Sequence, residues 1–234
     1  MRQFPHPPSR LTIIIWGAML LGVLLDLLLI GAAMIGADSP LKMPGGAVAL
    51  ATVAPLLLYG FVFLRVTATR APKASRALRI GTGFGVGGGV IQVIHMALEN
   101  FGSRLGENPP LTLAFMFGGF VVWGVSGYCA ARWTGQWTGG PIAGCWSGLI
   151  SVLVAVTFGL ILMTANIPSP AYIATWREYL ESGWTNARAF GIENSLEAAL
   201  GHLMIGPAAG AVFGLIGGGM AKLAVRQPQT APGG

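Results

Sequence analysis

Residues 80–101 read IGTGFGVGGGVIQVIHMALENF, a stretch with one acidic residue and no lysine or arginine. A helix needs about 20 apolar residues to cross the roughly 30 Å hydrocarbon core of a bilayer, so this stretch suits a membrane span. Steps of four and three through it pick out a seam without a large apolar residue: Gly81, Gly85, Gly88, Gln92, His95, Glu99 and Gly102. We expect a central helix whose glycine end packs closely on a neighbour and whose polar end faces inward.

The rest of the chain has a similar composition. Hydrophobic residues make up 53% and charged residues 9%, and the mean hydropathy is +0.67, whereas soluble domains carry about 25% charged residues. Further apolar runs lie at residues 11–35, 46–66, 111–131, 140–164 and 198–221. The first run exceeds the 7 to 15 residues of a signal-peptide core, so we expect it to be retained. The sequence predicts an all-α polytopic bundle of six spans: one membrane domain over residues 11–225, with tails at 1–10 and 226–234.

Lysine and arginine gather on one side of the predicted spans. That side carries Arg2, Arg10, Arg65, Arg70, Lys73, Arg76, Arg79, Arg132, Lys222 and Arg226, in segments without an acidic residue. The other side carries Asp38, Glu107, Glu178, Glu181 and Glu193, against Lys42, Arg104, Arg177 and Arg188. The positive-inside rule therefore predicts a plasma (inner) membrane protein with both termini in the cytoplasm. The lipid bilayer is the expected partner, and nucleic acid is not, because the basic loop lacks interleaved aromatic residues.

Ionisable residues interrupt three of the predicted spans. They are Asp26 in the first, His95 and Glu99 in the third, and His202 in the sixth. A charged side chain near the bilayer centre costs about 2.5 to 3.5 kcal/mol on insertion scales, so such residues usually face each other or water. At 1.5 Å per residue, all four lie about 21 to 28 Å from the cytoplasmic ends of their helices. We predict that these four residues and Gln92 line one polar site in the outer part of the bundle.

The sixth span contains a ridge at intervals of four: His202, Gly206, Gly210, Gly214, Gly218 and Lys222. Repeated G-x-x-x-G spacing lets two helices approach closely in lipid. The expected counterpart in the fifth span is Gly140, Gly144 and Gly148. Pro207 lacks a backbone N–H and clashes with the preceding turn, so a kink is expected near it.

The predicted outer connection covers residues 166–197. Aromatic and apolar residues recur in it at helical spacing opposite charged ones, which predicts a short amphipathic helix in the membrane interface. The apolar face comprises Tyr172, Ile173, Trp176, Tyr179 and Leu180, and the charged face Arg177, Glu178 and Glu181.

Gly83, Gly85 and Gly88 match the G-x-G-x-x-G pattern of dinucleotide-binding folds. That pattern requires a preceding strand in a soluble sheet, whereas an arginine-rich loop precedes it here, so we interpret these residues as helix-packing glycines. Because no familiar catalytic motif is present either, an enzyme is not the favoured interpretation.

Three functional hypotheses remain open. The first is a small transporter or channel-like protein for an ion, proton or small polar solute, in which Asp26 and Glu99 bind a cation or exchange protons, no cofactor is needed, and Asp26→Asn or Glu99→Gln abolishes flux. The second is an accessory subunit of a membrane redox or photosynthetic complex. There His95 and His202 would ligate a haem or chlorophyll-like pigment, or, with Glu99 and Asp26, a divalent metal. The third is a scaffold or assembly protein whose glycine-rich faces pack against other membrane subunits.

Overall fold

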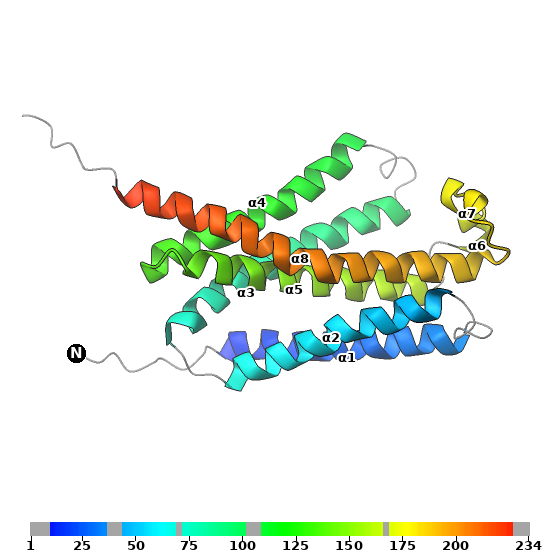
Figure 1. Ribbon diagram of the computed structural model, residues 1–234, viewed down its shortest axis with the longest axis horizontal. Coiled ribbons are helices and arrows are strands. Elements are labelled where there is room, and N and C mark those ends of the chain that lie inside the picture. The colour runs from blue at the N-terminus through cyan, green and yellow to red at the C-terminus, as the bar shows by residue number, and fades with distance from the viewer. Residues whose placement is uncertain (1–9, 37–43, 69–71, 102–108, 166–168, 227–234) are drawn as a thin grey trace, which may run out of the picture.

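The computed structural model describes residues 10–36, 44–68, 72–101, 109–165 and 169–226 of the chain. These residues form helices and no strands (Figure 1). The helices are α1 (Arg10–Gly36), α2 (Pro44–Ala68), α3 (Pro72–Phe101), α4 (Pro109–Thr134), α5 (Gly139–Thr164), α6 (Pro170–Ile173), α7 (Arg177–Ser182) and α8 (Ala187–Arg226). Six of them are long and apolar enough to cross a membrane, which confirms the predicted bundle. Most of the predicted tails, and the positions Asp38, Lys42, Arg104 and Glu107, lie outside the described residues.

Two spanning helices are longer than their apolar runs. α3 starts at Pro72, inside the basic segment, and α8 starts at Ala187, well before residue 198. Proline suits the first turn of a helix, where its missing N–H loses no bond. At α8 the side chain of Asn186 accepts a hydrogen bond from the backbone N–H of Ala189 at 3.1 Å, which is the action of a helix N-cap. The N-cap at Asn186 therefore extends α8 beyond the segment that hydropathy identifies, and Pro72 suits the early start of α3.

The connection between α5 and α8 contains two short helices instead of the single one predicted. α6 ends at Ile173 and α7 begins at Arg177. Gly183, with φ of 73°, lies in the left-handed region directly after α7, a conformation that glycine adopts without a steric penalty. Ile173 is buried against Gly191 of α8. Packing on α8 therefore holds this connection at the end of the bundle where α8 begins.

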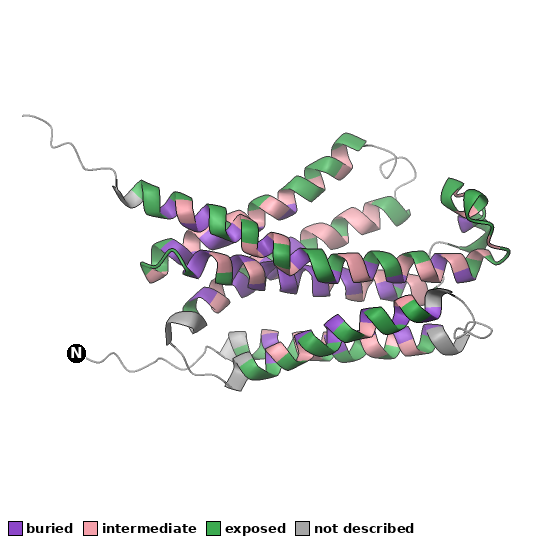
Figure 2. Ribbon diagram, in the orientation of Figure 1, coloured by how far each residue is buried: buried purple, intermediate pink, exposed green. Residues whose placement is uncertain are grey.

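α5 is the central helix, where we had expected α3. About two thirds of the residues in its apolar segment are buried, against 22 to 33% in the other five spans. Figure 2 shows buried residues along the length of α5. α3, α4, α8 and α1 all pack against α5. In Figure 1 the α1/α2 pair lies on the opposite side of α5 and α8 from α4. α8 continues through Pro207, and its ribbon changes direction in its middle part.

Glycines bring α5 and α8 into backbone contact, as their spacing predicts. The facing pairs are Gly148 with Gly206, Gly144 with Gly210, and Gly140 with Gly214. A methyl group on Gly144 would lie 2.6 Å from the Cα of Gly214, closer than two carbon atoms can approach. The glycine ridge of α8 is therefore buried against α5 of the same chain, and it does not form an exposed face for another subunit.

The glycine end of the α3 seam also faces α5. A methyl group on Gly81 would lie 2.6 Å from the carbonyl oxygen of Ala143, and one on Gly85 would lie 2.9 Å from that of Ser147. The hydroxyl of Ser151 donates to the carbonyl of Gly85 at 3.0 Å. This close contact orients the rest of α3, and so directs its polar end toward α5 and α8.

A buried hydroxyl joins α1, α3 and α5. The Oγ1 of Thr82 accepts hydrogen bonds from the indole N–H groups of Trp16 at 3.2 Å and Trp146 at 2.9 Å. It donates its own proton to the carbonyl of Leu78 at 2.8 Å. One hydroxyl thus satisfies two buried donors on different helices.

We expect Thr82→Val to lower the free energy of unfolding by about 2 kcal/mol or more, because it leaves two buried indole N–H groups without an acceptor. Thr82→Ser keeps the hydroxyl and is the control. Unfolding of the purified protein in detergent measures both variants, and equal stability of the two would contradict this role of the hydroxyl.

Candidate functional site

Two adjoining cavities lie between α3, α5 and α8, and the larger of them also borders α4. We name the larger one, of about 500 Å³, the aromatic cavity, and the smaller one, of about 270 Å³, the polar cavity. Their walls share Met96, Ala155, Ala198 and His202. Most wall residues belong to the later parts of α3 and α5 and the earlier parts of α4 and α8, which antiparallel packing brings to one level. This is the end of the bundle opposite the basic end, where α3 begins and α4 and α8 end.

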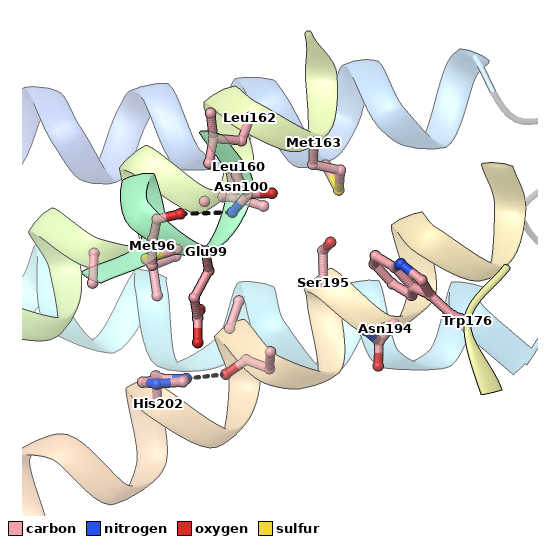
Figure 3. Close-up of a pocket in the computed structure, with 15 residues that line it drawn as sticks. Met96, Glu99, Asn100, Leu160, Leu162, Met163, Trp176, Asn194, Ser195 and His202 are labelled. Carbon is pink, nitrogen blue, oxygen red and sulfur yellow. Dashed lines mark hydrogen bonds between the residues drawn. The ribbon is translucent and has the colours of Figure 1, made fainter. Parts of the chain in front are cut away.

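Four of the five residues predicted from the sequence line these cavities. Gln92 and His95 face the aromatic cavity, Glu99 faces the polar cavity, and His202 faces both. Figure 3 shows the side chain of Glu99 extending from α3 toward His202 of α8. The polar end of the α3 seam and the first residue of the α8 ridge therefore meet at one place.

His95 is held between an aromatic ring and a carboxylate. Its imidazole stacks on Phe115 of α4, with centroids 4.9 Å apart and planes inclined by 26°. Its Nε2 lies 3.2 Å from Oε1 of Glu99, one helical turn away, but without the alignment of a hydrogen bond. The carboxylate is 40% exposed. The Glu99 carboxylate is therefore accessible to a solute, and the His95 imidazole lies next to it.

The hydrogen bond made by His202 defines its tautomer. Its Nδ1 lies 2.7 Å from the carbonyl oxygen of Ala198. A carbonyl only accepts, so Nδ1 carries the proton. In the neutral ring Nε2 is then an acceptor, and it has no partner among the described residues.

Two further polar atoms in the wall of the aromatic cavity lack a partner. Oε1 of Gln92 and Nε2 of His95 are buried and make no hydrogen bond within the described residues. A buried polar atom without a partner costs about 1 to 3 kcal/mol. Within the described residues, the cavity walls contain no lysine or arginine. The cavity walls therefore offer the acceptor oxygens of Gln92 and Glu99 together with two imidazoles.

Several wall residues were missed by the sequence analysis. The polar cavity also includes Asn100, Trp176, Asn194 and Ser195. Asn194 and Ser195 fall within the predicted connection. In the structure, both residues belong to the first turns of α8. The signal that marks them is the N-cap at Asn186, which starts the helix two turns before Asn194.

Asp26 lines neither cavity, although its depth along α1 suggested a shared site. It is completely buried, and Thr157 of α5 is its polar neighbour. Neither carboxyl oxygen makes a hydrogen bond of regular geometry in the described part of the chain. α1 packs on α2 and α5, so Asp26 meets a face of α5 different from the one that lines the cavities.

The metal alternative finds no cluster of ligands. Across the described ranges, no three His, Cys, Asp or Glu side chains lie close enough together to hold one ion. Asp26, which would complete the set of His95, Glu99 and His202, lies apart from the cavities. The haem or pigment alternative keeps one supporting fact, because both His95 and His202 line the aromatic cavity.

Comparison with known protein families, with curated proteins and with solved structures finds no match for this chain. Its class therefore follows from its own structure. In the described part of the chain, six helices have the length and hydropathy of membrane spans, which defines a multi-pass helical membrane protein.

Proposed function

We propose that this protein transports a small cation, either a monovalent metal ion or a small protonated amine, through the two cavities. The observation that carries the proposal is the group of acceptors in the cavity walls: the buried, unpaired Oε1 of Gln92, the Nε2 of His202, and the carboxylate of Glu99 with His95 beside it. A positively charged solute that passes through the two cavities is attracted by each of these acceptors. Ionisable groups inside a membrane domain commonly mark such a pathway.

The aromatic wall supports the same class of solute. Phe115, Phe120 and Trp123 line the aromatic cavity, and Trp176 lines the polar one. Aromatic faces attract cations, by about 2 kcal/mol where water is excluded. A cation that leaves water for the two cavities is therefore stabilised by aromatic rings as well as by Glu99 in the polar cavity.

The packing below the cavities supports a transport cycle with access from one side at a time. Gly148 meets Gly206 directly beneath them, and the glycine pairs continue toward the basic end. This contact closes the bundle there, while Glu99 remains accessible at the opposite end. Separation of α8 from α5 along the glycine pairs would open the closed side, in the manner of rocking transporters.

A cavity-filling variant tests the proposal. Gly201 lines the aromatic cavity, and a methyl group on it would meet no atom within 4 Å, so Gly201→Phe is expected to fold and to place its ring in the pathway. Gly219→Phe, on the same helix and equally unobstructed, is the control. In proteoliposomes on a solid-supported membrane, sodium, potassium or tetramethylammonium should evoke a current with the wild type and the control, and none with Gly201→Phe. Absence of current with all three cations, or full current with Gly201→Phe, contradicts the proposal.

The second candidate is a haem- or pigment-bearing subunit, favoured by the presence of both histidines in the aromatic cavity. A visible absorption spectrum of the purified protein separates the two functions. A haem or chlorophyll-like band supports this candidate, and a colourless protein removes it.

A further inference from the structure

A third hollow lies at the basic end of the bundle, between α3 and α4. It measures about 790 Å³ and shares no wall residue with the two cavities of the candidate site. Arg76, Arg79 and Trp133 line one end, and Ile80, Phe84 and Ile91 continue along α3. We name it the α3/α4 groove. Its two ends differ in chemistry, because one is cationic and the other apolar.

Glycines open the floor of this groove. A methyl group on Gly83 or Gly87 would meet no atom within 4 Å, and both residues line the groove. The neighbouring seam glycine, Gly85, packs against α5 instead. Gly83 is therefore not a helix-packing residue, contrary to our interpretation of the G-x-G-x-x-G pattern. The alternating glycines of α3 thus lie on two faces of the helix. One face packs against α5, and the other is open.

The positive charge at the head of the groove is not balanced within the described residues. Arg76 donates a hydrogen bond to the carbonyl of Trp133 at 3.1 Å, and neither Arg76 nor Arg79 forms an ion pair with a described carboxylate. The guanidinium groups thus keep donors available for an anion, which arginine binds through its planar fork. Trp133 is 68% exposed, and tryptophan is enriched where hydrocarbon meets headgroups.

We propose that the α3/α4 groove binds one anionic phospholipid, with its phosphate on Arg76 and Arg79 and one acyl chain along Gly83 and Gly87. The distance from Arg76 to Ile91 along a helix is about 22 Å, which exceeds half of the roughly 30 Å hydrocarbon core. The groove is therefore long enough for an acyl chain of one leaflet. Basic residues at a membrane surface each add about 1 kcal/mol of attraction to anionic lipid, so the headgroup selects the lipid and the groove orients it.

Native mass spectrometry of the full-length protein, titrated with phosphatidylglycerol or phosphatidylcholine, tests the proposal. We expect the wild type to retain one phosphatidylglycerol in preference to phosphatidylcholine. Arg76→Gln with Arg79→Gln should weaken phosphatidylglycerol binding about tenfold or more, from the loss of two charges. The control, Arg132→Gln with Lys222→Gln, removes the same charge outside the groove and should bind as the wild type does.

A second variant tests the groove without changing its charge. Gly83→Phe fills the open floor, and its Cβ meets no atom, so the protein should fold while losing phosphatidylglycerol. Equal binding of both lipids, equal loss in the charge control, or unchanged binding by Gly83→Phe would each overturn the proposal. Thermal unfolding of every variant establishes whether the protein is folded, so that a loss of lipid binding is not mistaken for a loss of folding.

Discussion

Gly214→Ala is expected to lower the free energy of unfolding by about 3 kcal/mol or more, the upper range for overpacking a core. Gly214 lies between two helices. A methyl group on it would lie 2.8 Å from the Cα of Gly144 on α5, and one on Gly127 of α4 would lie 2.5 Å from the Cα of Gly214. The obstructing atoms are backbone, which cannot rotate away as a side chain can. α8 and α5 must therefore move apart to admit one carbon atom, and α4, which packs closely on Gly214, limits that movement.

Gly219→Ala is the matched control, because it makes the same change five residues further along α8, where a methyl group meets no atom within 4 Å. Alanine reduces the freedom of the unfolded chain, so this variant should gain up to about 1 kcal/mol. The two substitutions thus have opposite expected signs. Thermal and denaturant unfolding in detergent, monitored by circular dichroism, measures both. A Gly214→Ala protein as stable as Gly219→Ala would refute the close contact of α8 with α5.

Glu99→Gln is expected to reduce cation-driven current by at least about tenfold, the factor for losing a charge-assisted interaction of about 1.5 kcal/mol or more. The substitution preserves the shape of the side chain and removes only its charge. His95 remains stacked on Phe115, so the cavity wall keeps its form. This prediction rests on the proposed transport function, and the same proteoliposome currents measure it.

Glu178→Gln is the matched control for this experiment. Glu178 is an exposed glutamate on α7, near the same end of the bundle, and it lines neither cavity. We expect wild-type current from Glu178→Gln. A Glu99→Gln protein that conducts as well as this control would remove Glu99 from the pathway. Asp26→Asn, measured alongside, separates a site with one carboxylate from a site that also uses the acid on α1.

Much of the site could be predicted because the α3 seam is a property of one helix. Gln92, His95 and Glu99 share a face through their spacing alone, and the structure places them at two adjoining cavities. The glycine pairs of α5 and α8 could be predicted for the same reason. Asn194 and Ser195 could not be found from hydropathy, because the first turns of α8 are too polar to extend its apolar run and only the cap at Asn186 marks them as helix.

The sequence alone determines that six segments enter a membrane, because the transfer free energy of each segment depends on its own length and composition. It also determines the position of each polar residue along its own helix, since rise along a helix is constant. Which residues share a site is decided only by tertiary packing. Asp26 and Glu99 have similar depths, but the rotation of α1 on α5 turns Asp26 toward Thr157. Likewise α5 covers Gly85, whereas Gly83 lies open in the α3/α4 groove, because the neighbours of each helix face depend on contacts between segments distant in the chain.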